Sequence, residues 1–258
     1  MMAKIAKVCI RLFMVLLFVA PGHAAINPGT VAGAWLFNEG SGTTAKDSSS
    51  NGKDGKIQGG AKWVQGKFGK ALEFNGTDAL VAVPNIGTFD EVTITAWVMT
   101  TGRTGQWRVI IDNNGWKAGD IHHQLAPNNQ VEFSLNGNPG GNDQFGKFLF
   151  DNSQLNEWHH LATAYSSKER KVRFYVDGQL DVETAWGGNA GTLGPAWIGA
   201  WDGEVRYWQG VLDEIVIFNV ILSVDDIKTV MDKGIKGITA VSPLDKLTTT
   251  WATVKTIF

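Results

Sequence analysis

The sequence has 258 residues, and its 23 Lys and Arg against 25 Asp and Glu give a formal net charge of −2 at pH 7. This balance argues against nucleic acid and anionic lipid as partners, because both attract proteins with a basic surplus. Glycine is abundant at 31 residues, and tryptophan occurs 11 times, a composition that favours a loop-rich protein with many aromatic side chains.

The first segment has the pattern of a secretory signal peptide, which we assign to residues 1–24. The segment begins with the basic residues Lys4, Lys7 and Arg11 and continues with an apolar run over residues 12–20. Gly22 and Ala24 are the small residues of the cleavage site. The apolar run is shorter than the roughly 17 residues of a membrane-spanning helix. We therefore expect a secreted, periplasmic or cell-surface protein with no membrane insertion after cleavage, a retained anchor being the alternative.

Cleavage would also remove the one cysteine, Cys9, and the three basic residues of the signal. Removing 3 of the 23 basic residues leaves 20 against 25 acidic ones, a formal charge of −5. The mature chain would then fold without disulfides, so a hydrophobic core must hold it together.

From residue 31 onward, short apolar runs alternate in polarity and are separated by glycine-containing turns, as strands with one buried face are. The runs cover residues 31–37, 71–74, 79–83, 92–99, 108–112, 131–135, 159–165, 171–176 and 211–218. In the run at 92–98, for example, Val92, Ile94, Ala96 and Val98 share one face. The dipeptide Asp177-Gly178 predicts a tight hairpin turn, because both residues tolerate the positive φ angles that it requires.

One short helix is predicted near the C-terminus. Ser223 would cap it with Asp226 three residues later, and Gly234 would end it. Many strands with a single helix predict an all-β protein in which two antiparallel sheets pack face to face. We expect this domain to span residues 25–237, followed by a tail of unknown role at 238–258.

Several motifs in this order resemble those of laminin-G-like jelly-roll domains in the concanavalin A-like lectin and glucanase superfamily. They are AWLFNEGSG at 34–42, GKALEFNG at 69–76, VTITAWV at 92–98, EWHHLA at 157–162, FYVDGQ at 174–179 and GVLDEIVIF at 210–218. The resemblance implies a two-sheet jelly roll that binds glycans or extracellular proteins, frequently with a calcium ion at one rim. It does not imply one ligand, because fold and function separate in such widespread folds.

For calcium, which takes hard oxygen ligands from loops, the candidate ligands are Glu39, Asp47 and Asp213. The first and last strands of a jelly roll commonly lie together, so the loop that carries Glu39 and Asp47 is expected to approach Asp213. The alternative is that these carboxylates cap turns and accept backbone hydrogen bonds.

Two histidine pairs, His122-His123 and His159-His160, suggest zinc at first sight. Adjacent residues of a strand point to opposite faces, and no third ligand accompanies either pair at zinc spacing. We therefore interpret these histidines as hydrogen-bonded or solvent-facing.

Tryptophans in loop-like surroundings are candidates for sugar binding, because sugar rings stack their C–H faces on aromatic planes while polar side chains bind the hydroxyls. The candidate ligand-binding residues are Trp107, Trp116, Trp186, Trp201 and Trp208, with Asp112, Asn114, Gln124 and Arg206 as polar partners. The alternative is that these tryptophans close the ends of the sandwich.

Catalysis by paired carboxylates would require two such groups flanking a glycosidic bond, and the acidic clusters do not have that spacing. In Asp213-Glu214, adjacent positions are expected to point to opposite faces of their strand. The sequence therefore predicts a secreted, non-catalytic carbohydrate-binding module with calcium as a candidate cofactor. An adhesion or surface-assembly protein that binds another protein is the first alternative, and a glycan-active enzyme is the second.

Overall fold

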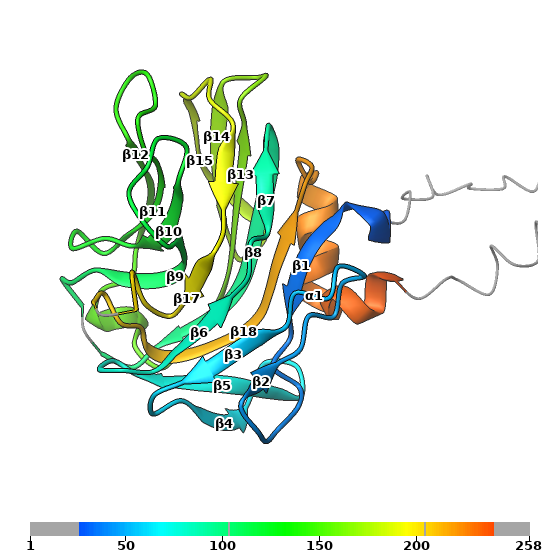
Figure 1. Ribbon diagram of the computed structural model, residues 1–258. Helices are drawn as coiled ribbons and strands as arrows, with labels where there is room; N and C mark the ends of the chain where they lie inside the picture. The colour runs from blue at the N-terminus through cyan, green and yellow to red at the C-terminus, as the bar shows by residue number, and fades with distance from the viewer. Residues whose placement is uncertain (1–25, 103, 204, 240–258) are drawn as a thin grey trace, which may run out of the picture.

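The computed structural model describes residues 26–102, 104–203 and 205–239. These residues form two eight-stranded sheets packed face to face, with a small two-stranded sheet beside them (Figure 1). Every ladder between the described strands is antiparallel. The predicted all-β, two-sheet jelly-roll sandwich is thereby confirmed.

The first sheet, here called sheet A, has the order β15-β14-β13-β8-β18-β5-β4, and β1 pairs with β18. Its strands are β1 (Val31–Trp35), β4 (Lys62–Gln65), β5 (Lys70–Asn75), β8 (Glu91–Thr100), β13 (Trp158–Ser166), β14 (Lys171–Val176), β15 (Gln179–Ala185) and β18 (Gln209–Phe218). The three neighbouring strands at its centre, β13, β8 and β18, are the longest in the described part of the chain.

The second sheet, sheet B, has the order β12-β11-β10-β9-β17-β6-β3-β2. Its strands are β2 (Thr44–Ala45), β3 (Gly55–Gln58), β6 (Leu80–Val83), β9 (Arg108–Asn113), β10 (Ile121–Leu125), β11 (Gln130–Leu135), β12 (Asp143–Leu149) and β17 (Ala196–Ile198). The small sheet pairs β7 (Gly87–Phe89) with β16 (Gly191–Leu193), and two 3-10 turns occupy Pro28–Thr30 and Asn152–Gln154.

The core lies between the two sheets. On β8, the predicted set Val92, Ile94, Ala96 and Val98 is fully buried in it, as alternation requires. On β11 of the opposite sheet, residues 131, 133 and 135 point into the same core. Each fully buried apolar side chain of this kind contributes roughly 1.5–3 kcal/mol, so this core stabilises a fold whose described residues contain no cysteine.

The β14–β15 hairpin turns at Asp177-Gly178, where both residues have positive φ angles of 49° and 72°. The Asp177 carboxylate also braces the neighbouring strand: Oδ1 accepts a bond from the His160 backbone N–H at 2.9 Å, and Oδ2 lies 2.8 Å from His159 Nδ1. The hairpin prediction is confirmed.

Helix α1 (Val224–Thr239) covers part of the outer face of sheet A. Ser223 Oγ accepts a hydrogen bond from the Asp226 N–H at 3.1 Å, and the Ser223 N–H donates to Asp226 Oδ2 at 3.3 Å, which confirms the predicted cap. Gly234 ends the first helical segment, as predicted: its φ of 63° and ψ of 172° are not helical, and a second, short helical segment follows it within α1. Glycine allows this conformation because it has no Cβ.

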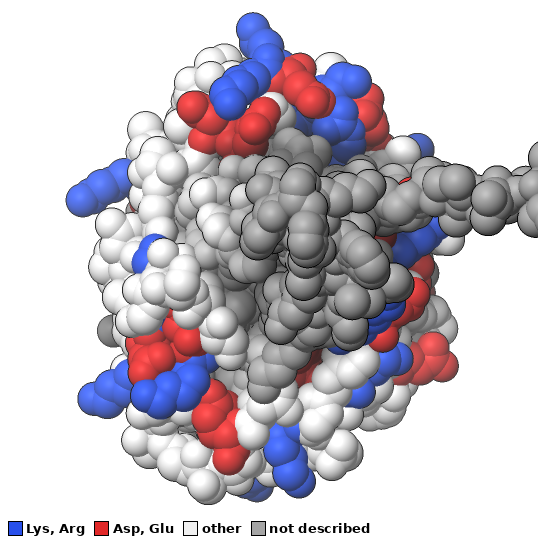
Figure 2. Space-filling model, turned by 90° about the vertical axis from the view of Figure 1, so that its right-hand side faces the viewer, with Lys and Arg blue, Asp and Glu red and all other residues white. Residues whose placement is uncertain are grey.

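The proposed signal peptide, residues 1–24, and residues 240–258 of the predicted tail lie outside the described residues. Within the described part of the chain, no helix is long and apolar enough to cross a membrane. Figure 2 shows the side of the molecule at the right of Figure 1, where basic and acidic side chains alternate around the visible face instead of gathering by sign.

Candidate functional site

A row of side chains crosses the outer face of sheet B. Directly paired residues of antiparallel strands share a face, and the ladder pairs Ala82, Trp197, Asp112, His122, Ser134 and Asp143 in that order. Their sequence neighbours, such as Ile111 and Phe133, point into the core. The strands β6, β17, β9, β10, β11 and β12 therefore present one continuous, mostly polar row away from the core.

The centre of this row is a buried chain of polar groups. His122 Nδ1 lies 3.3 Å from Asp112 Oδ2, and His122 Nε2 lies 3.2 Å from Asn136 Nδ2. Asp112 Oδ1 accepts the backbone N–H of His123 at 2.7 Å. Because the Asn136 amide nitrogen only donates, His122 Nε2 accepts and the ring proton lies on Nδ1, which faces Asp112 Oδ2 without reaching hydrogen-bond geometry.

Two tryptophans cover the imidazole of His122. The ring of Trp116 lies 4.8 Å from it and meets the ring of Trp201 edge to face at 6.1 Å. The Trp116 side chain nevertheless remains 52% exposed. An aromatic plane is thus held against the polar row from one side and is open to solvent from the other.

Arg206 joins the aromatic pair to the next part of the face. Its guanidinium lies over Trp201 at 4.7 Å and over Trp107 at 4.6 Å, and Nη1 donates to Gln124 Oε1 at 3.2 Å. Beside it, a cavity of about 360 Å³ is lined by Gly105, Gln106, Trp107, Pro127 and Arg206. Stacking of this kind contributes about 0.5–2 kcal/mol and holds the guanidinium in place.

A carboxyl group that the sequence analysis missed, Glu132, lies next to this row on β11, directly opposite Gln124. It is 2% exposed, and its Oε2 has no hydrogen-bond partner among the described residues. Burial raises the pKa of Glu132 to about 9, and the nearby carboxylates of Asp143 and Asp112 add to the rise while Arg206 opposes it. The group is therefore protonated at neutral pH. Its place between Val131 and Phe133 in an alternating strand was the signal that it faces outward.

Six of the nine predicted ligand-binding residues come together on this face: Trp107, Asp112, Trp116, Gln124, Trp201 and Arg206. Asn114 is exposed in the same loop as Trp116, and its N–H donates to the Pro195 carbonyl.

The other two predicted residues lie in the hydrophobic core. Trp208 is fully buried, and Trp186 is nearly so, with its Nε1 donating to the Gly141 carbonyl at 2.9 Å. Packing in the sandwich therefore describes the position of both tryptophans. Trp186 in addition lines a cavity of about 550 Å³, which lies apart from the row on sheet B.

The three calcium candidates each bind backbone N–H groups. Asp47 accepts from the N–H groups of Ala34, Ser49 and Lys53, and Glu39 accepts from that of Lys46. Within the described ranges, no group of three or more His, Cys, Asp or Glu residues is placed to hold a metal ion. The three carboxylates are thus not brought together. Calcium binding stays a prediction, which a melting curve with and without added calcium would test.

Asp213, the third candidate, accepts the N–H groups of Lys67 and Phe68 at 2.9 and 3.1 Å. Burial raises its pKa to about 7, while these backbone N–H groups oppose the rise. Asp213 therefore ties the loop after β4 to the centre of β18.

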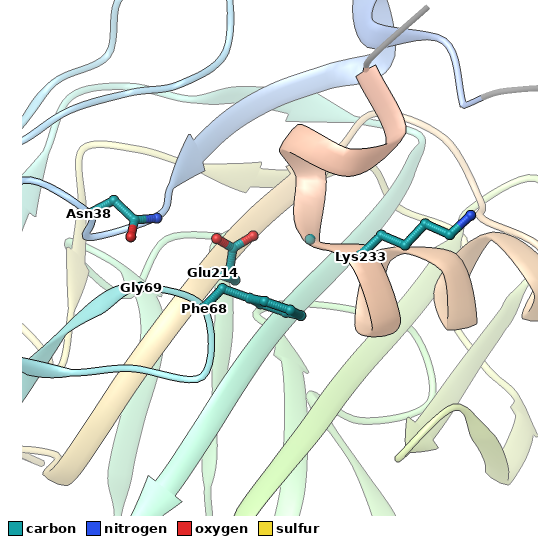
Figure 3. A pocket seen from close by; sticks show the side chains of 6 residues that line it. Asn38, Phe68, Gly69, Glu214 and Lys233 are labelled. Atoms are coloured by element: carbon teal, nitrogen blue, oxygen red, sulfur yellow. The ribbon is translucent and has the colours of Figure 1, made fainter. Parts of the chain in front are cut away.

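Its neighbour Glu214 lines a cavity of about 320 Å³ with Asn38, Phe68, Gly69, Lys233 and Gly234 (Figure 3). Glu214 Oε2 accepts the Ile235 N–H at 3.3 Å and so holds the kinked end of α1. The expectation that Asp213 and Glu214 point to opposite faces is wrong, since both carboxylates meet the segment around Phe68. A register shift between Asp213 and Val216 and a φ of 48° at Glu214 break the alternation.

The sandwich fold and its aromatic, polar outer face define a jelly-roll domain of the lectin-like class. The family model described as the concanavalin A-like lectin/glucanases superfamily matches residues 75–228. The chain belongs to this family, which confirms the resemblance found in its motifs. The comparison with curated proteins finds no match.

Solved structures share the fold at low identity. The binding domain of Paraclostridial Mosquitocidal Protein 1 is 15% identical, with a TM-score of 0.63 over 80% of this chain and 52% of that one. Domain 4 of AbnA, a GH43 extracellular arabinanase from Geobacillus stearothermophilus in complex with arabinotriose, is 16% identical, with a TM-score of 0.59 over 78% and 97%.

The receptor-binding domain of the botulinum neurotoxin C/D mosaic serotype is 11% identical, with a TM-score of 0.62 over 79% and 51%. The chain thus spans about half the length of the two toxin domains and nearly all of the arabinanase domain. The structural neighbours are mainly binding domains.

Proposed function

We propose that this protein is an exported, non-catalytic module that binds a carbohydrate on the outer face of sheet B. The observation that carries the proposal is the pair Trp116 and Trp201 set edge to face over the polar row, with Trp116 half exposed. Large exposed aromatic rings are uncommon on monomeric proteins and commonly mark interaction sites.

The chemistry of the face fits a sugar. Trp116 offers an apolar plane for the C–H face of a pyranose or furanose ring. Arg206 lies at the edge of the same surface, held by the buried Gln124 and by the stacked tryptophans. A guanidinium held in this way can donate to hydroxyls without first losing much side-chain freedom, which favours affinity.

The similar structures support a binding role. Domain 4 of AbnA is in complex with arabinotriose, and the binding domain of botulinum neurotoxin DC is in complex with rat synaptotagmin II. The partner is a sugar in the first case and a protein in the second. For the present chain the aromatic face favours a sugar, because it combines a stacking surface with a group that can bind hydroxyls.

A glycan array followed by calorimetry tests the proposal. Trp116→Ala and Trp201→Ala should each lower the affinity for the best glycan by ~1 kcal/mol or more, the size of one aromatic contact. Trp158→Ala is the matched control, because Trp158 is a half-buried tryptophan on sheet A. Unchanged affinity in both site variants would contradict the site. Binding of proteins but no glycans would favour the adhesion alternative, and cleavage of a polysaccharide by the purified protein would contradict the non-catalytic role.

A further inference from the structure

The polar floor of the binding face is acidic. Asp112, Glu132 and Asp143 come from β9, β11 and β12, and the ladder places them on the same side of sheet B. Asp143 is exposed and bonds to Ser134 Oγ at 2.8 Å, whereas Asp112 and Glu132 are buried behind it. Carboxyl groups on three adjacent or nearly adjacent strands therefore form a patch that opens to solvent through Asp143.

Positive charge does not balance this patch. Among the described residues, no Lys or Arg forms a salt bridge within 4.0 Å of these three carboxyl groups. The Arg206 guanidinium lowers the pKa of Glu132 through its charge but donates its hydrogen bond to Gln124. The His122 imidazole lies beside Asp112 and has its Nε2 paired with Asn136 Nδ2.

Two buried side-chain oxygen atoms at this site also lack hydrogen-bond partners. Glu132 Oε2 and Asn136 Oδ1 belong to side chains that are 2% exposed, and neither atom has a hydrogen-bond partner within the described part of the chain. A buried polar atom without a partner costs about 1–3 kcal/mol. Such an unpartnered atom is explained at a binding site, where a ligand can supply the missing partner.

We infer that the glycan bound on this face carries a free, positively charged amine, so that the ligand class is an amino sugar that is not N-acetylated. An ammonium group brings one positive charge and three donors, which match the surplus carboxyl groups and the unpaired acceptors. Uronic acids and sulfated sugars are repelled by the same patch. This inference rests on the proposed carbohydrate-binding function.

The protonation of Glu132 provides a second signature. The groups that face it are Asp112 on β9, Asp143 on β12 and Arg206 in the loop before β18, with His122 beside Asp112. A cation bound among them stabilises the ionised form of Glu132, whose pKa in the free protein is about 9. Binding of the amine at pH 7 should therefore release protons to the buffer, whereas binding of a neutral sugar should not.

The test compares three oligosaccharides of equal length: glucosamine, N-acetylglucosamine and galacturonic acid. We expect calorimetry to show about tenfold tighter binding of the glucosamine oligomer than of its N-acetylated counterpart, the size of a charge-assisted contact. The galacturonic acid oligomer should bind most weakly. Repeating the titration in buffers of different ionisation enthalpy measures the protons released.

Matched variants separate the parts of the claim. Asp143→Asn and Glu132→Gln should each abolish most of the preference for the glucosamine oligomer over its N-acetylated counterpart. Glu183→Gln, which removes an exposed carboxylate on β15 of sheet A, should change nothing. Equal binding of both oligomers with Trp116-dependent affinity would overturn the amine inference alone, whereas no binding of any glycan would overturn the proposed function with it.

Discussion

The outer faces of the two sheets differ in how they are covered. On sheet A, the apolar side chains of Val216 and Phe218 are covered by Ile227 and Val230 of α1, so this part of the face is closed by the chain itself. On sheet B, the equivalent surface carries buried polar groups under a tryptophan that is half open to solvent. The face that α1 covers contributes to the stability of the fold, and the proposed function places recognition on the face where Trp116 is open to solvent.

The largest loss of stability should come from a substitution beneath α1, on the outer face of sheet A. Phe218→Ala removes a fully buried ring between β18 and its neighbours and should lower the free energy of unfolding by about 3–5 kcal/mol. Denaturant unfolding followed by tryptophan fluorescence measures the loss. A cost below about 1 kcal/mol would show that the contact with α1 contributes little to the fold.

The stability contributed by the polar face of sheet B should depend on pH through Glu132. Glu132 has a pKa of about 9 in the folded protein against an ordinary pKa of 4.5, so between these values the folded state holds a proton that the unfolded state has lost. The stability of the wild type should therefore fall as pH rises through this window, by up to about 1.4 kcal/mol per pH unit from this group. Glu132→Gln removes that contribution.

Unfolding of the two proteins at pH 5, 7 and 9 checks the sign, which is set by that raised pKa. The stability of Glu132→Gln relative to the wild type should increase steadily with pH. A difference that stays constant across the series would mean that Glu132 is ionised in the folded protein.

The stability of the protein should depend on the N-terminal cap of α1. Ser223→Ala removes the acceptor for the Asp226 N–H and should cost about 1 kcal/mol of stability. Ser223→Thr, which keeps both the acceptor and the hydroxyl that donates to Asp226 Oδ2, is the control and should restore most of the loss. Equal destabilisation by both variants would place the effect outside the cap.

The smallest effect on stability should come from Trp116→Ala. Its ring is half exposed and lies outside the core, so the change in unfolding free energy should remain within about 0.5 kcal/mol. This variant would then lose glycan affinity without losing stability, the opposite of Phe218→Ala. Strong destabilisation would indicate that Trp116 is a structural plug over His122.

Local patterns predicted much of the fold. Alternation placed residues 92–98 with the right face inward, Asp177-Gly178 identified a hairpin, and Ser223 marked the start of α1. Each of these depends on residues a few positions apart, for which sequence spacing is a sufficient guide.

The site was predicted only in part, because its properties depend on strands that are distant in the sequence. Trp116 and Trp208 both occur in loop-like surroundings, yet one is half exposed and the other is in the core. The raised pKa of Glu132 depends on Asp112 and Asp143, which the ladder of β9 to β12 brings near it. The bulge that turns Glu214 towards α1 left no signal in the alternation of β18.

The central claim is that the ligand meets the outer face of sheet B at Trp116 and Trp201. The most direct test follows the indole N–H signals of the tryptophans by NMR while the best glycan from the array is added. The account predicts shifts of the Trp116 and Trp201 signals and none at Trp63 or Trp158, which lie on sheet A. Shifts at the sheet A tryptophans with Trp116 and Trp201 unchanged would contradict it.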